Sequence, residues 1–384
     1  MNRIKDIRNV KNLKGKKIIL RLDLNVPLKN GKIADDFRIK RAIPAIKYLK
    51  SKKAKVVVIS HIGRNKKETL KPIAEYINKI TKISFYKNTI GEDVLKKIEK
   101  MKNGEAVLLE NLRRHDGEIG NKMSFARELA KLGDVYVNDA FANSHRKHAS
   151  MVILPKLLPA YANSLLLEEI KELKTVFSPP RPFLFILGGA KPKTKIPLIK
   201  KYIRIADFIF IGGALANNFY KNLGYEVGRS LVRDSGALVS GILNSKKIIL
   251  PIDVVVKNRN KIKVKYPNAL SPSDQIVDVG PKSIEMLCNH IKKSNFILFN
   301  GPLGNYEDGF GNTTQKVLKD ILNSKKKSII GGGDTALLAL RIAKRGKFSF
   351  ISTGGGAMLE FLVRGTLPAI EALKNKTKNK VRVS

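Results

Sequence analysis

Short apolar runs alternate with segments of helical periodicity along nearly the whole chain. In the first half, this pattern predicts strands at Lys17–Leu22, Lys55–Ser60, Ala106–Leu109 and Asp134–Val137, and helices at Arg38–Lys50 and Ser124–Leu132. In the second half, it predicts strands at Phe183–Leu187, Phe208–Ile211, Phe296–Phe299, Ser328–Ile330 and Phe348–Ser352, and helices at Asn312–Leu322 and Leu338–Lys344. Such alternation is typical of βαβ units, whose parallel sheets are covered by helices on both faces. We therefore expect an α/β fold with mostly parallel sheets.

The two halves are separated by an amphipathic segment and a proline-rich stretch. Leu165–Phe177 has helical periodicity, and Ser178–Pro182 contains three prolines, which cannot continue a helix. A chain of 384 residues is also too long for one hydrophobic core. We therefore expect two Rossmann-like domains, residues 1–164 and 178–365, joined by a connecting helix at 165–177 and a hinge.

Polar and cationic residues follow the predicted strands of the first half. They occur at Arg21–Asn25, Ser60–Arg64, Glu110–Arg113 and Asn143–Arg146. Open α/β sheets bind ligands beyond the carboxyl ends of their strands, and arginine presents a planar set of donors that fits phosphate and carboxylate oxygens. A single arginine after a strand is usually a solvated end, but four such strand ends predict a site for a small, multiply anionic substrate.

Glycine follows the predicted strands of the second half. The clusters are Gly188–Lys191, Gly212–Gly213, Asn300–Pro302, Gly331–Asp334 and Gly354–Gly356. Glycine lets the backbone approach a ligand closely, and the helix that follows turns its N-terminal amides toward an anion. One cluster alone is ordinary turn sequence, but the set favours a site for nucleotide phosphates. Together, the two halves suggest a phosphoryl-transfer enzyme whose domains close.

Other interpretations of these motifs are weaker. Gly331–Ala336 fits the loose dinucleotide pattern, but the next strand ends at Ser352–Gly354, where the ribose-binding acid of a nicotinamide dehydrogenase should stand. The chain has no P-loop and no protein-kinase catalytic loop. His145–His148 has a His-x-x-His spacing without a cysteine or acidic ligand near it in sequence, which favours anion binding or a surface pair over zinc. Asp23 and Asp139 are also suited to capping turns.

The charge of the chain is strongly positive, with 74 Lys+Arg against 32 Asp+Glu and a formal net charge of +42. This balance suits nucleic acid, an anionic surface or small anionic substrates. The lysines are scattered without interleaved aromatic residues, so we expect no specific nucleic-acid partner, although a non-enzymatic anion-binding protein stays an alternative. The single cysteine, Cys288, excludes an intramolecular disulfide, and Met1–Val10 has no apolar signal region. We therefore expect a cytoplasmic protein without a membrane partner.

The strand-end motifs, taken in order, resemble those of the phosphoglycerate kinase family. The matching segments are Arg21–Pro27 (RLDLNVP), Ser60–Arg64 (SHIGR), Leu109–Arg113 (LENLR), Val137–His148 (VNDAFANSHRKH), Leu187–Lys195 (LGGAKPKTK), Asn300–Glu307 (NGPLGNYE), Gly331–Ala336 (GGGDTA) and Ser352–Met358 (STGGGAM). The resemblance implies reversible phosphoryl transfer from 1,3-bisphosphoglycerate to ADP, giving 3-phosphoglycerate and ATP in glycolysis and gluconeogenesis. It also implies hinge closure, Mg²⁺ with the nucleotide, a monomer, and a C-terminal segment, residues 366–384, that returns to the first domain.

The resemblance also implies roles for individual residues. The phosphoglycerate-binding residues would be Asp23, Leu24, Asn25, Arg38, His61, Ile62, Gly63, Arg64, Arg113 and Arg146. The nucleotide-binding residues would be Lys195, Gly212, Gly213, Asn300, Glu307, Gly332, Gly333, Asp334 and Thr335, with Glu307 at the ribose, Gly212 and Gly213 at the adenine, and Asp334 at the metal. The catalytic groups would be Arg38, Lys191, Gly355 and Gly356.

Three segments depart from the family's usual sequence. Pro192–Thr194 is more basic, and Asn305-Tyr306 precedes the expected ribose contact. Ala214 stands where many members have a third glycine, which leaves the preference for ATP or GTP open. Lys191 and Lys195 are four residues apart, a spacing that predicts one shared helix face.

Overall fold

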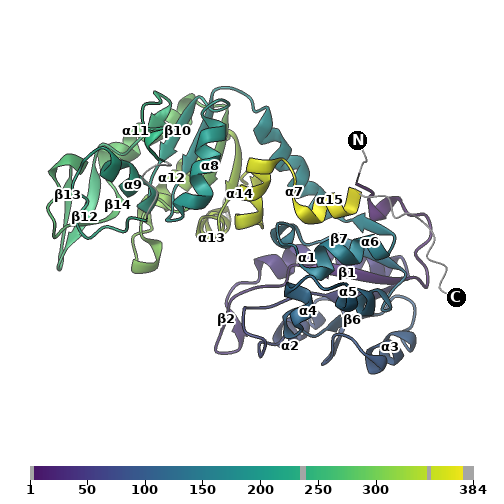
Figure 1. Cartoon of the computed structure of the whole chain (residues 1–384). Helices are drawn as coiled ribbons and strands as arrows, with labels where there is room; N and C mark the ends of the chain where they lie inside the picture. The colour runs from purple at the N-terminus through teal and green to yellow at the C-terminus, as the bar shows by residue number, and fades with distance from the viewer. Residues whose placement is uncertain (1–3, 234–238, 344–346, 375–384) are drawn as a thin grey trace. The chain divides into compact units, whose positions relative to one another are not determined.

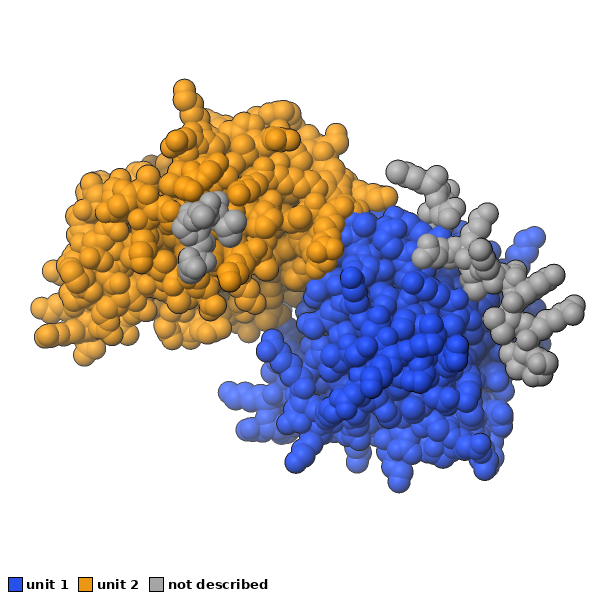
Figure 2. Space-filling view, viewed as in Figure 1, with its two compact units in different colours: residues 1–170, 366–384 blue, residues 171–365 orange. Residues whose placement is uncertain are grey.

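The computed structural model describes residues 4–233, 239–343 and 347–374. The chain forms two compact units, one of residues Met1–Ile170 and Thr366–Ser384 and one of residues Lys171–Gly365, coloured blue and orange in Figure 2. The chain passes from the first unit to the second within helix α7 (Ser164–Lys174), which continues into the 3-10 turn η5 (Thr175–Phe177). No helix among the described residues is long and apolar enough to cross a membrane.

Unit 1 is built on a six-stranded parallel sheet with the strand order β5-β6-β4-β1-β7-β8. Its strands are β1 (Lys17–Leu22), β4 (Lys55–Ile59), β5 (Ser84–Tyr86), β6 (Ala106–Leu109), β7 (Val135–Asp139) and β8 (Ala160–Ala162). Its helices are α1 (Phe37–Ser51), α2 (Lys71–Asn78), α3 (Glu92–Glu99), α4 (Asp116–Ile119), α5 (Met123–Ala130), the π-helical turn η4 (Ala149–Ile153) and α6 (Leu154–Leu157). A two-stranded hairpin, β2 (Leu28–Lys29) and β3 (Lys32–Ile33), follows β1.

The apolar runs of unit 1 form strands because both faces of the sheet are covered. Ile18, Leu20 and Leu22 of β1 pack with Ile39 and Ile46 of α1 in one fully buried cluster. Each such side chain contributes about 1.5–3 kcal/mol by leaving water. Because strand side chains alternate, Arg21 lies on the face of β1 opposite this cluster, and it too is fully buried.

Unit 2 is built on a second six-stranded parallel sheet, in the order β11-β10-β9-β15-β16-β17. Its strands are β9 (Phe183–Leu187), β10 (Phe208–Ile211), β11 (Ile248–Ile249), β15 (Phe296–Asn300), β16 (Lys327–Gly331) and β17 (Phe350–Ile351). Its helices are α8 (Pro192–Tyr202), α9 (Ala214–Asn222), α11 (Pro281–Lys293), α12 (Asn312–Ser324), α13 (Gly333–Ile342) and α14 (Gly355–Arg364). The predicted α/β fold with mostly parallel sheets is confirmed.

A small antiparallel sheet at one end of unit 2 is absent from the sequence-based prediction (Figure 1). It has the order β13-β12-β14, with β12 at Val254–Asn258, β13 at Lys261–Lys265 and β14 at Gln275–Val279. Lysine alternates with Ile262 and Val264 in β13, which is a strand signal. Because both apolar side chains are exposed and flanked by charges, the same sequence is also typical of a charged loop.

Two predicted elements of unit 2 have different ends in the structure. Helix α13 begins at Gly333, five residues before the predicted start at Leu338, because glycine is tolerated in the first turn of a helix, where the amides have no partner within the helix. The predicted Lys344 end lies outside the described residues. Strand β17 covers only Phe350–Ile351 of the predicted Phe348–Ser352.

The last described helix, α15 (Pro368–Lys374), belongs to unit 1. The backbone N–H of Ala369 donates to the carbonyl of Ser144 at 3.1 Å. Ala369 also packs with Ala140 and Met151 in a small buried cluster. The residues after β7 are therefore held partly by the C-terminal part of the chain.

Candidate active site

The polar strand ends of unit 1 gather along one edge of its sheet. They follow β6, β4, β1 and β7, which are consecutive neighbours in the sheet. The carboxyl ends of parallel strands meet at the same edge, so residues distant in sequence become adjacent there. The backbone N–H of Gly63 donates to Oδ1 of Asn25 at 2.8 Å, and Nη1 of Arg113 donates to the carbonyl of Gly63. Three of the predicted substrate segments are thus directly connected. We call this region the arginine-rich edge.

Helix α1 adds Arg38 to the arginine-rich edge. Its Nη1 donates to the carbonyl of Asn25 at 2.8 Å and lies 3.2 Å from Oδ2 of Asp23. Asp23 is buried, and its Oδ1 accepts a hydrogen bond from the backbone N–H of Asn25. Asp23 therefore both caps the turn and positions a guanidinium, although the pattern alone made Arg38 an ordinary surface residue.

Positive charge dominates the arginine-rich edge. Arg64 and Arg146 are exposed, whereas His61 and Arg113 are buried. Burial is the largest cause that lowers the pKa of His61 well below its usual value, and Arg21, Arg113 and Arg146 add to it. Burial and the neighbouring Arg146 also lower the pKa of Arg113. An anion bound here would relieve this repulsion.

Leu24 and Ile62 face the interior of unit 1. Both side chains are buried, the backbone N–H of Leu24 donates to Oγ of Ser60 at 3.1 Å, and that of Ile62 donates to Oδ1 of Asn111 at 3.2 Å. These two predicted substrate residues hold their loops in place through bonds inside the protein.

His148, the second histidine of the His-x-x-His segment, is buried rather than part of a surface pair. Its Nδ1 lies 3.7 Å from Oε1 of Glu118, an acid far away in sequence. Burial is the main cause that lowers the pKa of His148 to about 4, with Arg21 and Arg113 adding to it. The described residues contain no group of three His, Cys, Asp or Glu side chains able to hold a metal ion.

The glycine clusters of unit 2 also gather along one sheet edge, which we call the glycine-rich edge. They follow β10, β9, β15, β16 and β17, again consecutive neighbours. A Cβ on Gly188 would lie 2.6 Å from the carbonyl oxygen of Gly301. Gly213 has a φ of +62°, and its Cβ would lie 2.6 Å from the backbone nitrogen of Gly189. These turns pack directly on one another, so only glycine fits at both positions.

Gly333 differs from these packing glycines. A Cβ placed there would meet nothing within 4 Å. The packing of the protein therefore does not require glycine at this position, which opens the first turn of α13 to a ligand. Gly355 at the start of α14 lies close by, since its Cβ would stand 3.6 Å from Cα of Gly332. Two helix N-termini, whose first amides have no partner within their own helix, thus lie side by side.

The two lysines of this edge occupy different environments, contrary to the expectation of a shared helix face. Lys191 is the exposed residue before α8. Lys195 is buried within α8, and its Nζ donates to the carbonyls of Gly188 and, at 3.3 Å, Asn300. Burial, with a smaller contribution from Lys191, lowers the pKa of Lys195 to about 7.

Asp334 and Thr335 lie in the first turn of α13. Asp334 is exposed, whereas Oγ1 of Thr335 is buried and has no hydrogen-bond partner. A carboxylate beside an unsatisfied hydroxyl suits Mg²⁺, which commonly takes one or two carboxylates and completes its shell with water and substrate phosphates. The residues present therefore fit a metal–nucleotide complex.

The remaining predicted nucleotide residues lie on other turns of unit 2. Asn300 ends β15 and is buried, and Gly212 follows β10 with its Cβ position 2.7 Å from Cδ2 of Leu303. Glu307 is exposed in the 3-10 turn η7 (Tyr306–Asp308), and no described contact joins it to the other predicted residues. The atypical Tyr306 is partly buried against the core of unit 2 and anchors this turn.

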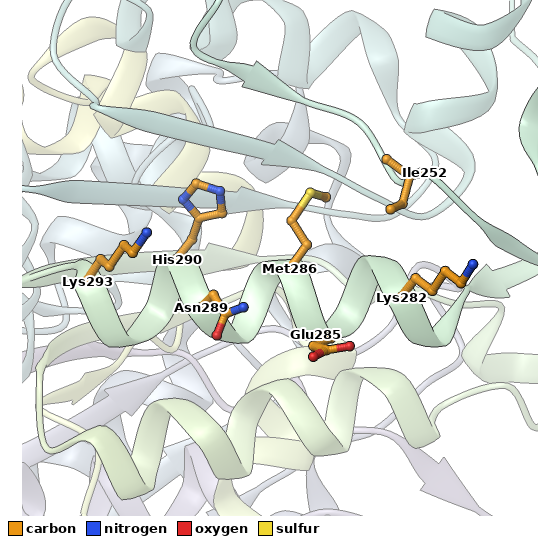
Figure 3. Close-up of a pocket in the computed structure, with 7 residues that line it drawn as sticks. All are labelled: Ile252, Lys282, Glu285, Met286, Asn289, His290 and Lys293. Carbon is orange, nitrogen blue, oxygen red and sulfur yellow. The ribbon is translucent and has the colours of Figure 1, made fainter.

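A groove of about 560 Å³ lies on the outer face of α11 (Figure 3). It is lined by Ile252, Lys282, Glu285, Met286, Asn289, His290 and Lys293. No predicted site residue lines it. Because Ile284, Leu287 and Ile291 bury the opposite face of α11, the groove is a feature of the helix surface and is separate from the glycine-rich edge.

Comparisons with known proteins agree on one family. The family model described as "Phosphoglycerate kinase" matches residues 4–364. The phosphoglycerate kinase of Dictyoglomus turgidum is 41% identical over 394 residues, covering 97% of this chain and 99% of that protein. The phosphoglycerate kinase of Aquifex aeolicus is 41% identical over 400 residues, covering 98% of this chain and 100% of that protein.

Solved structures of two proteins from this family resemble the chain over nearly its whole length. The phosphoglycerate kinase of Coxiella burnetii has a TM-score of 0.83 and 33% identity, with 98% of this chain and 100% of that chain covered. The phosphoglycerate kinase of Pyrococcus horikoshii has a TM-score of 0.87 and 29% identity, with 97% of this chain and 98% of that chain covered.

Proposed function

The chain belongs to the phosphoglycerate kinase family, and from this premise we propose that the arginine-rich edge of unit 1 binds phosphoglycerate and the glycine-rich edge of unit 2 binds the nucleotide. The enzyme transfers a phosphoryl group between 1,3-bisphosphoglycerate and ADP, giving 3-phosphoglycerate and ATP in glycolysis and gluconeogenesis. This assignment of one ligand to each unit is supported by the different hydrogen-bond donors of the two edges. Guanidinium groups of Arg38 and Arg113 are fixed in unit 1, while α13 and α14 of unit 2 offer N-terminal amides that have no partner within their own helix.

Phosphoglycerate binding uses the side chains and loops of the arginine-rich edge. Asp23 and Asn25 hold Arg38, and Asn25 also holds the backbone of Gly63. The exposed Arg64 and Arg146 would meet the phosphate and carboxylate oxygens, and His61 would donate a hydrogen bond. Leu24 and Ile62 support these groups from the interior.

Phosphoryl transfer requires positioning and charge neutralisation more than covalent chemistry, because its transition state is loose. Arg38 and Lys191 would supply positive charge, and Gly355 and Gly356 would turn N-terminal amides of α14 toward the moving group. Removal of one such donor typically costs about a hundred- to a thousandfold in rate. The acyl-phosphate P–O bond breaks as the ADP oxygen bonds to phosphorus, and the carboxylate leaves with the electron pair.

Nucleotide binding would use both buried and exposed groups of unit 2. Lys195 and Asn300 lie beneath the phosphate-facing turns, and Gly332 and Gly333 leave room for phosphate oxygens. Asp334 and Thr335 would hold Mg²⁺, which when bound neutralises phosphate charge. Glu307 would bind the ribose, and Gly212 and Gly213 would border the base, whose identity as adenine or guanine Ala214 leaves open.

The finer organisation of the enzyme belongs to the same proposal. The domains would comprise residues 1–164 and 178–365, with the connecting helix at 165–177 and the returning segment at 366–384. Closure about this helix would exclude water from the acyl phosphate. We propose a cytoplasmic monomer whose partners are its small-molecule substrates, without a nucleic-acid or membrane partner.

The first experiment measures ATP formation from ADP and enzymatically generated 1,3-bisphosphoglycerate, with Mg²⁺ and with a chelator. The account predicts ATP formation only when Mg²⁺ is present. Equal rates with chelator would remove the metal from the proposal. No ATP from a folded sample would instead favour a non-catalytic anion-binding protein.

A further inference from the structure

A chain of buried polar side chains lies behind the arginine-rich edge. It contains Glu118 of α4, Ser150 of η4, Arg21 of β1 and His61 after β4. The first three are 0% exposed and His61 is 3% exposed. Glu118 and Ser150 have no role in the phosphoglycerate site as described so far, and nothing in their sequence pattern marks them.

Arg21 is the central donor of this chain, toward Ser150 on one side and toward His61 on the other. Oε2 of Glu118 accepts from the backbone N–H of Ser150 at 2.9 Å, and Oε1 accepts from the hydroxyl of Ser150 at 2.6 Å. The hydroxyl proton is thus committed to Glu118, which leaves an Oγ lone pair for Arg21. Nε of Arg21 donates to this Oγ at 3.1 Å, and Nη1 donates to the carbonyl of Leu22. The guanidinium plane is therefore fixed at two points.

The fixed guanidinium determines the protonation of His61. Nη2 of Arg21 lies 3.3 Å from Nδ1 of His61. A guanidinium has five N–H donors and no acceptor, so Nδ1 must accept. The proton of the neutral ring is then on Nε2. Burial and the surrounding Arg21, Arg113, Arg146 and His148 keep the ring neutral by lowering the pKa of His61.

We propose that Glu118 and Ser150 are positioning residues, which orient Arg21 so that His61 is locked as the Nε2–H tautomer and donates a hydrogen bond to the anionic substrate. This inference rests on the proposed role of the arginine-rich edge. A free imidazole exchanges between two tautomers, only one of which presents an N–H at Nε2. If the ring is already the Nε2–H tautomer before the substrate binds, binding does not have to supply the free energy of selecting that tautomer.

The alternative is a network that only stabilises the fold. Glu118 compensates the buried charge of Arg21, and removal of one partner from such a network is generally destabilising. Loss of activity or stability alone would therefore not distinguish the two roles. The tautomer of His61 does distinguish them, because a purely structural network has no reason to determine it.

The test is ¹⁵N NMR of the full chain labelled at histidine. The chain has five histidines, and the His61 signal is identified by its loss in His61→Gln. The wild-type protein is expected to show His61 protonated at Nε2 only. In Ser150→Ala, which removes the oxygen between Glu118 and Arg21, the signal should move toward a mixture of tautomers. The KM for 3-phosphoglycerate should rise in proportion to the lost Nε2–H fraction, about twofold for an equal mixture of tautomers, with the KM for ATP unchanged.

Two further variants and one control complete the test. Ser150→Thr keeps the hydroxyl and should restore the tautomer and the KM. Glu118→Gln should produce the same changes as Ser150→Ala to a smaller extent, and it provides the readout if Ser150→Ala does not fold. Ile77→Ala on α2 removes a fully buried side chain from the same unit, on a helix that packs on α1, β3 and β5. This control should lower stability and keep the Nε2–H tautomer.

A wild-type His61 protonated at Nδ1 would overturn the inference, as would an unchanged Nε2–H signal in both Ser150→Ala and Glu118→Gln. A tautomer that responds as expected in an enzyme whose phosphoglycerate affinity does not change would support the positioning role and contradict the proposed role of His61 at the substrate. The spectroscopic and kinetic results therefore separate the two claims.

Discussion

The arginine-rich edge of unit 1 and the glycine-rich edge of unit 2 offer an anion opposite kinds of hydrogen-bond donor. Both edges lie at the carboxyl ends of a parallel six-stranded sheet. In unit 1, the donors are long side chains held by other loops, as Asn25 holds Arg38 and Gly63. In unit 2, the donors are backbone amides, and glycines such as Gly188 and Gly213 let neighbouring turns pack within van der Waals distance.

This difference suits the two ligands. A small substrate with two different anionic groups is recognised best by directional side chains at fixed positions. A nucleotide has a chain of similar phosphates, which helix N-termini accept with little discrimination. The comparison also predicts how each edge fails: side-chain substitutions in unit 1 should change ligand binding without loss of stability, whereas most glycine substitutions in unit 2 should damage the fold first.

Loss of Arg38 should have the largest effect. Arg38→Ala is expected to lower kcat by about a hundred- to a thousandfold, because the proposed role of this guanidinium is to neutralise charge in the transition state. The melting temperature should fall only slightly, because the buried Asp23 loses a partner whose own side chain is about one-third exposed. Steady-state kinetics and thermal unfolding measure the two quantities. Arg127→Ala, which removes an exposed arginine on α5, is the matched control and should retain full activity.

Loss of Lys191 should have the next largest effect and tests the glycine-rich edge. Lys191→Ala is expected to lower kcat by about a hundredfold, because this exposed cation lies beside the turn after β9. Lys193→Ala, two residues along in the first turn of α8, removes the same charge and should change kcat less than threefold. Equal losses in both variants would show that general positive charge, rather than one placed lysine, supports the reaction.

Two glycine substitutions should separate packing from ligand binding in unit 2. Gly188→Ala should lower the free energy of unfolding by roughly 1–3 kcal/mol, since its Cβ would overlap the turn after β15. Gly333→Ala should leave stability unchanged or slightly raised, because the site is open and alanine favours helix. It should nevertheless weaken ADP binding by about tenfold. Chemical denaturation and calorimetric titration would contradict this contrast if Gly333→Ala lost stability as Gly188→Ala does.

The smallest expected effect is the uptake of a proton by Lys195 when ADP binds. Its pKa of about 7 in the folded protein means that the amine is mostly neutral at pH 8. A bound phosphate would favour the charged form and raise this pKa, so ADP binding at pH 8 should take up close to one proton, and less at pH 6. Calorimetry in buffers of different ionisation enthalpy measures this number. Lys195→Met should abolish the uptake, and its persistence in that variant would assign the proton to another group.

The predicted strands of the two parallel sheets could be identified from the sequence because most of their residues are buried on both faces, and the motif residues were predictable because they follow those strands. Which strand ends lie next to one another was not predictable. That β6, β4, β1 and β7 are adjacent is a property of topology, and only that order connects Asn25 to Gly63 and Gly63 to Arg113. Lys191 and Lys195 have different environments because α8 begins between them, at Pro192. The basic sequence around this proline does not show at which residue the helix begins.

The contacts of buried polar residues were the hardest feature to predict from the sequence. Asp139 illustrates this: its Oδ1 accepts from the backbone N–H of Leu166 at 3.0 Å and its Oδ2 from Asn163, so it caps α7 as one interpretation of the sequence allowed. Burial is the main cause that raises its pKa to about 7. Glu118 and Ser150 were missed because they are far apart in sequence and because Arg21, which links them to His61, lies in a strand still farther away.

The most direct test of the division between the two edges is a comparison of ligand affinities by calorimetric titration. 3-Phosphoglycerate and ADP are titrated separately into the wild-type protein, Arg146→Ala and Gly333→Ala. The account predicts that Arg146→Ala weakens 3-phosphoglycerate binding at least about tenfold and leaves ADP within twofold, and that Gly333→Ala does the reverse. Either variant weakening both ligands equally, or weakening only the ligand assigned to the other edge, would contradict it.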